Sequence, residues 1–248
     1  MLRLLTKRNK RRIRRLPEGV RIYAIGDVHG RIDLLDQVFS RIDAHLAAHP
    51  IVRPVEVLVG DYIDRGPASR EVLDRLIARA ADNETVLLKG NHETSIFEFL
   101  RRPAHFTEWS QMGGIETLMS YGITPSLNSD ATAQKELAVA LRSRLPKSHR
   151  TFLGTLRTSF TCGGYFFVHA GVRPRVALSK QREEDLLWIR DEFLLHEEDF
   201  GKIVVHGHTP VRDVDIRFNR INIDTGAYAT GRLTCLVMED DAVEPLAV

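Results

Sequence analysis

Residues 20–30 read VRIYAIGDVHG, and this segment carries the strongest structural signal in the chain. Its first half, Val20–Ile25, is an apolar run rich in β-branched residues, which is typical of a buried strand. The strand is expected to end at Gly26, so Asp27 and His29 follow it directly. Flanking glycines permit the tight turn that such a strand end requires.

The same pattern recurs twice further along the chain. Val55–Val59 and Thr85–Leu88 are also short apolar runs that end near a glycine. Helical patterns separate the three predicted strands, the first with an apolar stripe and the second opened by Pro67. The stripe of the first helix consists of Ile32, Leu35, Phe39, Ile42 and Leu46. A βαβαβ order of this kind predicts an α/β domain.

The second half of the chain starts with a helical insertion over about residues 91–146. Its large residues recur at helical spacing and are interpreted as a packing face; they include Trp109, Met112, Ile115, Leu118 and Met119. Strands are predicted again at 165–168 and 203–205, then at 214–218, 221–223 and 233–238. The last three are closely spaced, as in antiparallel ribbons.

The amino-acid composition is typical of a globular protein. The 248 residues are 43% hydrophobic and 27% charged, and no stretch approaches the ~18 apolar residues of a membrane-spanning helix. The two cysteines, Cys162 and Cys235, suit a reducing compartment, so we expect a cytoplasmic protein.

Charge is distributed unevenly along the chain. Eight of the 35 basic residues lie within residues 1–15, which contain no acid, and this leaves 27 basic against 33 acidic residues elsewhere. We expect residues 1–16 to form a basic, flexible tail, with one domain over 17–248. The alternative is that residues 3–15 make a weak contact with a polyanion.

Polar side chains follow five predicted strands at the point where each strand ends. The segments are Gly26–Gly30, Gly60–Gly66, Gly90–Glu93, Val168–Gly171 and Val205–Pro210. Ligands of open α/β sheets bind beyond the carboxyl ends of the strands, so these side chains are expected to converge. Mixed carboxylate, imidazole and amide donors suit octahedral divalent ions, and their number implies two ions bridged by Asp61.

These motifs resemble the metallophosphoesterase superfamily and, within it, the phosphoprotein phosphatase family in a compact bacterial or phage form. The resemblance covers about residues 19–238. It implies a calcineurin-like sandwich of two sheets flanked by helices, four α/β/β/α layers in all. It also implies two divalent ions, most readily Mn²⁺, with Fe/Zn or Mg²⁺ as alternatives.

The resemblance also implies a role for individual residues. The metal ligands would be Asp27, His29, Asp61, Asn91, His169 and His208. His92 would be the catalytic acid, oriented by Asp64, and phosphate would be held by Arg65, Arg190 and Asn91. For the late histidine His206 is the alternative to His208, and for the second arginine Arg173 and Arg175 are the alternatives to Arg190.

The implied reaction is hydrolysis of a phosphate ester by in-line attack of metal-bound hydroxide. Pro210 stands where other branches of the superfamily carry a further histidine, and Asp64-Arg65-Gly66 also favours the protein phosphatase branch. A phosphorylated serine or threonine in a protein is therefore the favoured substrate. Hydrolysis of dinucleoside polyphosphates or RNA 5′ ends, a broad small-molecule phosphatase and a non-catalytic phospho-binding scaffold remain as alternatives.

Overall fold

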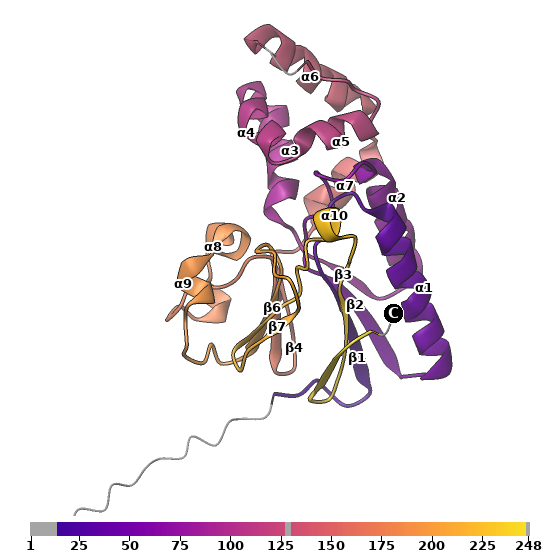
Figure 1. The fold of residues 1–248 in the computed structure, drawn as a ribbon, viewed down its shortest axis with the longest axis vertical. Helices are drawn as coiled ribbons and strands as arrows, with labels where there is room; N and C mark the ends of the chain where they lie inside the picture. The colour runs from indigo at the N-terminus through magenta and orange to yellow at the C-terminus, as the bar shows by residue number, and fades with distance from the viewer. Residues whose placement is uncertain (1–13, 127–129, 247–248) are drawn as a thin grey trace, which may run out of the picture.

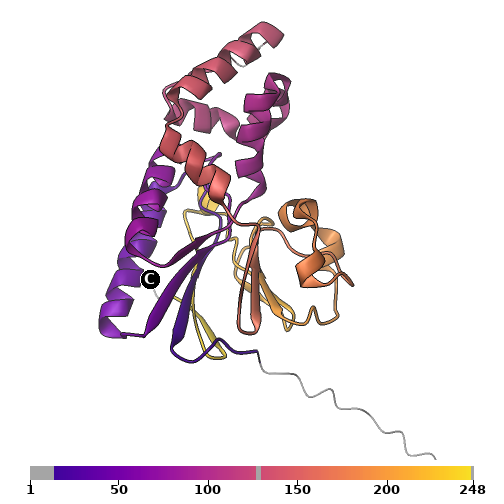
Figure 2. The same ribbon diagram turned by 180° about the vertical axis from the view of Figure 1, so that it is seen from behind.

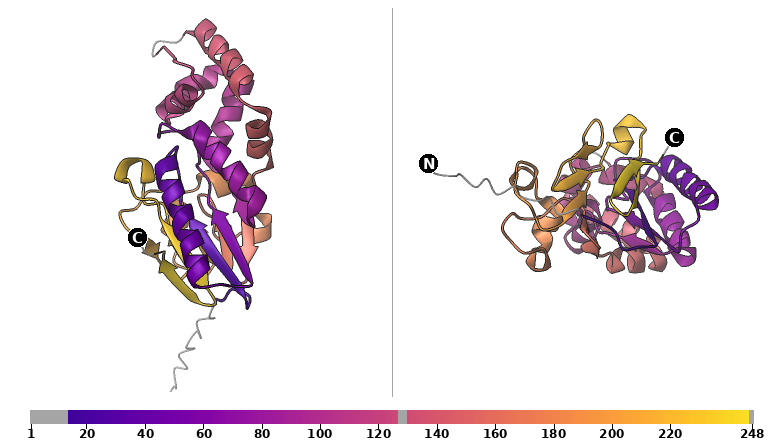
Figure 3. Two further views of the ribbon diagram at one scale, coloured as in Figure 1. Left: turned by 90° about the vertical axis from the view of Figure 1, so that its right-hand side faces the viewer. Right: turned by 90° about the horizontal axis from the view of Figure 1, so that it is seen from below.

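The structure, a computed structural model, describes residues 14–126 and 130–246. Two five-stranded sheets pack face to face, and helices cover their outer faces (Figure 1). A view from below shows α8 and α9 on one side, α1 and α2 on the other, and the sheets between them (Figure 3). The predicted four-layer calcineurin-like sandwich is confirmed.

The first sheet has the strand order β10-β9-β1-β2-β3. Its strands are β1 (Val20–Ile25), β2 (Arg53–Leu58), β3 (Thr85–Leu87), β9 (Cys235–Glu239) and β10 (Ala242–Pro245). β1, β2 and β3 are parallel, so their carboxyl ends meet at one edge, whereas β9 is antiparallel to β1. That shared edge carries the three motifs that the sequence places after these strands.

The second sheet has the order β4-β5-β6-β8-β7. Its strands are β4 (Ser159–Cys162), β5 (Tyr165–Val168), β6 (Ile203–His206), β7 (Asp215–Ile216) and β8 (Arg220–Asn222). β5, β6 and β8 are parallel, so this sheet also collects its carboxyl ends at one edge.

Burial on both faces explains why every residue of β1 except Arg21 is apolar. Ile22 and Ala24 face the second sheet, where they pack with residues such as Phe167. Tyr23 and Ile25 face the opposite way and pack against Phe39 of α1. Successive strand residues point to opposite faces, so a strand covered on both faces loses the polar half of its pattern.

The helices outside the insertion lie on the first sheet, on the second sheet and in one loop. The first sheet is covered by α1 (Ile32–Ala48) and α2 (Ser69–Asp82), which lie side by side in Figure 3. The second sheet is covered by η2 (Leu178–Lys180), α8 (Glu183–Trp188) and α9 (Asp191–Leu194). A short helix, α10 (Ala227–Thr230), lies in the loop that crosses from β8 to β9.

The helical insertion stands beyond the strand ends, as both faces of the molecule show (Figures 1 and 2). It contains α3 (Asn91–Arg101), η1 (Pro103–His105), α4 (Phe106–Gln111), α5 (Gly114–Ser120) and α6 (Ala131–Arg144). α7 (Lys147–Thr155) follows at once, so the helical region continues past the expected end at residue 146. Pro146 ends α6 but also stands at the N-cap of α7, because proline is tolerated at a helix start.

Two strands, β4 and β10, were not predicted from the sequence, and β9 pairs with a different strand from the one predicted. β4 and β10 are edge strands, each joined to its neighbour by a two-residue turn at Gly163–Gly164 or Asp240–Asp241. Edge strands are short and only half apolar, so their pattern is weak. The predicted ribbon of the last three strands is partly wrong: β7 and β8 pair, but β9 joins β1, where Leu236 and Met238 enter the core between the sheets.

The described part of the basic segment packs against the domain. Leu16 is buried between the sheets, and Arg14 forms an ion pair of 2.6 Å with Asp199. The rest of the predicted tail, residues 1–13, lies outside the described residues. Among the helices of residues 14–126 and 130–246, none has the length and apolar composition to cross a bilayer.

Candidate metal centre

The strand-end loops of the two sheets meet and are tied together by hydrogen bonds. Within the first sheet, the backbone N–H groups of Val28 and His29 donate to the carbonyl of Asp61 over 3.1 and 2.8 Å. Between the sheets, the backbone N–H of His208 donates to Asp27 Oδ2 over 3.0 Å. The five sequence motifs therefore converge, as predicted, at one edge of the sandwich.

Several of the predicted site residues have a left-handed backbone. The φ angles are +46° at His29, +52° at Asp61, +71° at Asp64, +67° at Arg65 and +67° at His208. Non-glycine residues adopt this region at a cost, and such residues cluster at functional sites where the surroundings hold them in place.

Glu93 is one of the groups that holds this conformation. Its buried carboxylate accepts the backbone N–H groups of Asp61, Tyr62 and Gly90 over 3.0, 2.7 and 2.8 Å. From the sequence alone, Glu93 belonged to the motif that starts at Gly90 but had no predicted role. Its signal was its position, three residues after a glycine that begins a helix, where a carboxylate reaches back to the N-terminal N–H groups.

Two triads of metal-ligating side chains share Asp61. The first is His29–Asp61–His92 and the second is Asp61–His169–His208, and all members are buried. Asp61 Oδ2 lies 3.4 Å from His29 Nε2, and Asp61 Oδ1 lies 3.4 Å from His169 Nε2. Each carboxylate oxygen thus faces a different triad, an arrangement that suits a dinuclear site with Asp61 as the bridge.

The donor atoms around the second triad have the spacing of a coordination sphere. Asn91 Oδ1 lies 2.9 Å from His169 Nε2 and 2.9 Å from His208 Nδ1. Donors bound to an octahedral ion at about 2.1 Å are about 3 Å apart. Asn91 therefore joins this triad as a fourth candidate ligand.

Hydrogen bonding indicates that His169 and His29 each present a lone pair, and not a proton, at Nε2. His169 Nδ1 lies 3.0 Å from the carbonyl of Val59, and His29 Nδ1 lies 2.9 Å from the carbonyl of Ile63. A carbonyl only accepts, so Nδ1 carries the proton and Nε2 is bare. The contact between His169 Nε2 and Asn91 Oδ1 then joins two acceptors, which a cation between them would stabilise.

The pKa values favour the same protonation states. Burial lowers the pKa of His29 to about 3 and that of His208 to about 2, and it also lowers the pKa of His169. Burial alone would raise the pKa of Asp61, but the nearby histidines outweigh it and lower the value. Near neutral pH the site therefore offers neutral imidazoles and a charged carboxylate, which are the metal-binding forms.

Asp27 lies beside the centre but in neither triad. The predicted partners of Asp27 were His29 and Asp61, whereas the first triad contains His92 in place of Asp27. Asp27 Oδ1 is buried without a hydrogen-bond partner, and burial together with the charges of Asp224 and Asp61 raises the pKa of this carboxyl. A buried carboxyl group that has one oxygen without a partner and lies next to another carboxylate would be stabilised by a cation, so Asp27 stays a predicted ligand.

His208, not His206, is the late histidine that joins the triad. His206 Nδ1 lies 3.0 Å from the carbonyl of its own neighbour Gly207, and its ring packs edge-on against Phe193. Its place is at the end of β6, where it supports the strand end on the side away from the triads.

Two glycines allow the carboxylates to reach the centre. A Cβ at Gly90 would overlap Asp61 Oδ1, and a Cβ at Gly207 would overlap Asp27 Oδ1. Both positions have ordinary negative backbone angles, so close approach and not conformation requires glycine there.

His92 and Asp64 form a buried pair next to the first triad. His92 Nδ1 lies 2.7 Å from Asp64 Oδ2, and His92 Nε2 lies 3.7 Å from Asp61 Oδ2. Burial opposes the charged imidazolium, but Asp61 and Asp64 outweigh it and raise the pKa of His92 to about 9. His92 therefore differs from the other site histidines, since at neutral pH it favours the imidazolium form, with a proton on both ring nitrogens.

Residues of the helical insertion fix Asp64. Trp109 Nε1 donates to Asp64 Oδ2 over 2.9 Å, and Thr117 Oγ1 donates to Asp64 Oδ1 over 2.6 Å. From the sequence alone, Trp109 was predicted to be a packing residue and Thr117 had no predicted role. Trp109 does pack, against Phe99, but its indole N–H also has a polar partner, as buried tryptophans usually require.

The candidate phosphate-binding arginines differ in whether a carboxylate pairs with them. Arg65 has its guanidinium over the ring of Tyr228, 4.5 Å from the ring centroid, and Arg190 donates to Thr209 Oγ1 over 3.2 Å. Among the described residues neither pairs with a carboxylate. Arg173 is instead held by Asp185 and Glu192, and Arg175 lies 3.9 Å from Glu198. The geometry therefore favours Arg65 and Arg190 for an anionic ligand.

Comparison with known proteins agrees with this geometry. The chain belongs to the calcineurin-like phosphoesterase family, whose model matches residues 20–243. It is 25% identical over 231 residues to bis(5′-nucleosyl)-tetraphosphatase PrpE [asymmetrical] of Anoxybacillus flavithermus. The aligned region covers 86% of this chain and 88% of that protein. This name corresponds to the alternative substrate in the sequence analysis, not to the favoured one.

Solved structures share the fold. A crystal structure described as a candidate diadenosine tetraphosphatase matches with a TM-score of 0.63 and 18% identity, over 93% of this chain and 94% of that one. A cold-active protein tyrosine phosphatase of a Shewanella species matches with a TM-score of 0.55 and 16% identity, over 95% and 84%. At these identities the likeness concerns the fold. Family and site together define a metal-dependent phosphoesterase.

Proposed function

We propose that the protein is a metal-dependent hydrolase that splits bis(5′-nucleosyl) tetraphosphates asymmetrically, into a nucleoside monophosphate and a nucleoside triphosphate. The observation that carries this proposal is the match, over 86% of this chain, to a protein named bis(5′-nucleosyl)-tetraphosphatase PrpE [asymmetrical]. The two triads that share Asp61 supply a site suited to reaction at phosphorus.

Two divalent ions would be held by Asp27, His29 and Asp61 on one side and by Asp61, Asn91, His169 and His208 on the other. Bound there, they would supply Lewis acidity and make water acidic enough to act as a nucleophile near neutral pH. The choice of Mn²⁺ over Fe/Zn or Mg²⁺ stays a prediction.

The protein's own groups bind and orient the phosphate chain. Arg65 and Arg190 lack carboxylate partners among the described residues, so their donors are free for the oxygens of the attacked phosphate. Guanidinium–phosphate contacts are charge-assisted and fix orientation as well as position. Asn91 lies between the second triad and His92, so its amide is in place to contact the same oxygens.

His92 would donate a proton to the leaving oxygen from Nε2. Asp64 receives the Nδ1–H, fixes the ring and keeps the imidazolium stable, while Trp109 and Thr117 hold Asp64. The proton matters most where the leaving group is strongly basic. A nucleotide leaving group is less basic than an alkoxide, so it depends less on His92.

The need of a strongly basic leaving group for a proton donor supports a second candidate function. An acid with a pKa of about 9, fixed by a buried carboxylate, suits the basic alkoxide released from phosphoserine or phosphothreonine. Serine/threonine protein phosphatase activity, which the sequence analysis favoured, is therefore the second proposal for the same centre.

The deciding experiment compares the two substrates at matched concentration with Mn²⁺. Diadenosine tetraphosphate and a phosphothreonine peptide are incubated with the full chain, and the products are separated by chromatography. The proposal predicts AMP and ATP in equal amounts and a preference for the dinucleotide. Two ADP, or a preference for the peptide, would contradict it; no turnover of either substrate or of an aryl phosphate would favour a binding protein.

A further inference from the structure

We propose that Trp188 is the stacking surface for one nucleobase of the substrate, the base on the monophosphate side of the bond that breaks. This inference rests on the proposed function and extends it, because it assigns a base-binding position beside the metal centre. Three observations carry it: the exposure of the indole, its contact with the second triad, and the free guanidinium two residues further along the chain.

The exposure of Trp188 is unusual for its size. The chain has two tryptophans; Trp109 is 0% exposed, whereas Trp188 is 44% exposed. Leaving that much aromatic surface in water forfeits a large share of its burial energy. The neighbouring Leu187 and Ile189 are buried, so the backbone that presents the indole is anchored to the second sheet and the ring is a fixed surface.

The contact of Trp188 places it at the metal centre. Its ring meets the ring of His208 edge-on, with centroids 6.3 Å apart and an interplanar angle of 84°. His208 belongs to the second triad. Arg190 is on the same segment and donates only to Thr209 Oγ1 among the described residues. An aromatic surface and an unpaired guanidinium thus stand together beside the triad, which matches the base and phosphate of one nucleotide.

Asymmetric cleavage explains why a base should lie so close. When a tetraphosphate is split into one and three phosphates, the bond that breaks joins the first and second phosphates, so at most one phosphate separates the near nucleoside from the attacked phosphorus. Its base therefore has to bind near the triads, while the second base lies at least two phosphates away. Every nucleobase has a π-face, so stacking on an aromatic ring holds it without selecting one base.

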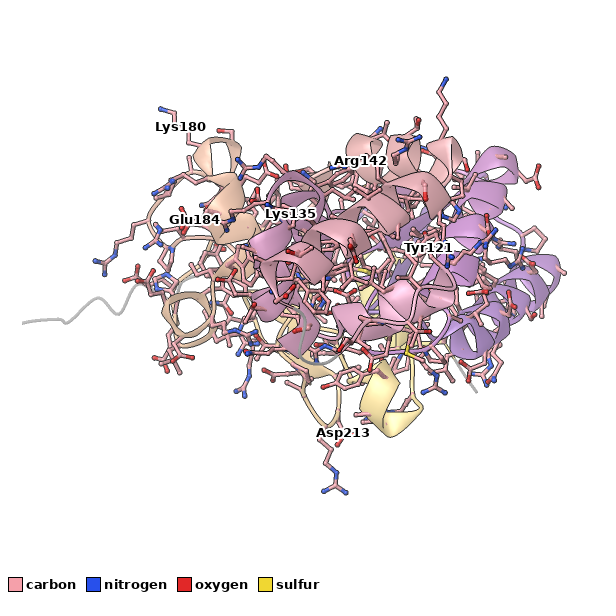
Figure 4. All side chains as sticks on the ribbon, turned by 90° about the horizontal axis from the view of Figure 1, so that it is seen from above. Tyr121, Lys135, Arg142, Lys180, Glu184 and Asp213 are labelled. Atoms are coloured by element: carbon pink, nitrogen blue, oxygen red, sulfur yellow. The ribbon has the colours of Figure 1, made fainter. Side chains whose placement is uncertain are left out.

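A second exposed aromatic residue lies near the first triad but is less suited. Tyr228 of α10 is 38% exposed and meets the ring of His29 with centroids 5.5 Å apart. One face of its ring is already covered by the guanidinium of Arg65. Figure 4 looks down on this end of the molecule: α6, with Lys135 and Arg142, crosses the view, and α8, marked by Glu184, and the yellow α10 lie toward different sides of it.

Fluorescence tests the inference without turnover. The full chain in Mg²⁺ is titrated with a methylene-bridged, non-hydrolysable analogue of diadenosine tetraphosphate and, separately, with inorganic tripolyphosphate, which has no base. We expect the analogue to quench the exposed tryptophan and tripolyphosphate to leave it unchanged. Trp188→Phe retains only the buried Trp109, so the base-dependent quenching should disappear. Equal quenching by both ligands, or quenching that persists in Trp188→Phe, would overturn the inference.

Kinetics gives a second readout with a matched control. Trp188→Ala should raise KM for diadenosine tetraphosphate about tenfold with little change in kcat, and Trp188→Phe should raise it less. Phe218→Ala is the control: Phe218 is 50% exposed and precedes β8, at the sheet edge opposite the site. An unchanged KM in Trp188→Ala refutes the base-stacking role while the dinucleotide activity stands. A wild-type chain that fails to hydrolyse the dinucleotide refutes the proposed function instead.

Discussion

The strand-end loops and the helical insertion contribute to the same centre in different ways. The loops supply the candidate metal ligands, and each ligand lies within a few residues of a strand end and a glycine. Past the first turn of α3 the insertion supplies no member of either triad; its Trp109 and Thr117 contact Asp64, which in turn contacts His92. Metal binding thus depends on local chain geometry, whereas orientation of the proton donor depends on packing between distant segments.

This difference predicts that the two functions can be damaged separately. Changes in the loops should remove metal and activity together. Changes in the insertion past the first turn of α3 should reduce turnover while metal remains, because no side chain of that part lies in a triad.

The largest effect is expected for Asp61→Asn, since both triads share this carboxylate. Activity should fall by at least about 10³-fold, as when a major charge-stabilising group is lost, and metal analysis should find less than two ions per chain. Asp36→Asn is the control, because Asp36 of α1 is exposed and pairs with Arg75 of α2. Two fully occupied ions in Asp61→Asn would refute the bridging role.

His92→Ala should reduce turnover of alkyl phosphates by about 10²–10⁴-fold, the range for a lost general acid. Metal content should stay near that of the wild type, and substrates with less basic leaving groups should suffer less. Parallel measurements on an alkyl and an aryl phosphate show the difference. Loss of metal along with activity would leave the general-acid role unsupported.

The pH profile reports on Asp64. The pKa of His92 is raised to about 9, so its proton is present at lower pH and is lost as the pH rises through that value. Asp64→Asn removes a negative partner of the imidazolium, so the fall of kcat on the alkaline side should move to lower pH. An alkaline limb that does not move would show that Asp64 does not act through His92.

Trp109→Phe tests the insertion directly. The change deletes the indole N–H that donates to Asp64 Oδ2 but keeps an aromatic ring against Phe99. Hydrogen bonds to charged groups contribute about 1.5–3 kcal/mol, so kcat should fall about tenfold or more with metal content unchanged. Phe99→Leu perturbs the same cluster without removing a donor, and an equal loss in both variants would reduce Trp109 to a packing residue.

The smallest effect is expected for Gly154→Ala in α7. Nothing lies within 4 Å of a Cβ at this position, so alanine should raise the free energy of unfolding by about 0.5–1 kcal/mol and leave activity unchanged. Gly207→Ala is its counterpart at the centre, where the new Cβ would displace Asp27. Thermal melts and metal analysis distinguish the two glycines, and equal behaviour would contradict the steric account.

Local signals explain what the sequence could predict. The parallel strands β1, β2 and β3 are buried on both faces, and each candidate ligand follows a strand end, so apolar runs and glycines were enough to single out Asp27, Asp61 and Asn91 as candidates. The roles of Glu93, Trp109 and Thr117 were missed for a different reason. Trp109 is 45 residues from Asp64 in the chain, and only the packing of α4 against α3 and η1 brings its indole N–H to the carboxylate.

The pairing of β9 shows the same limit. Its sequence favours a strand, but its partner depends on where the loop after β8 takes the chain, and that loop crosses between the sheets. Edge strands β4 and β10 were missed because a single covered face leaves a weak apolar pattern.

The most direct test is a crystal of the full chain soaked in Mn²⁺ and recorded at a wavelength where manganese scatters anomalously. The account predicts two peaks on either side of the Asp61 carboxylate. One should lie by His29 and Asp27, and the other by Asn91, His169 and His208. A single peak, or two peaks that do not share Asp61, would contradict the dinuclear centre on which the proposed function depends.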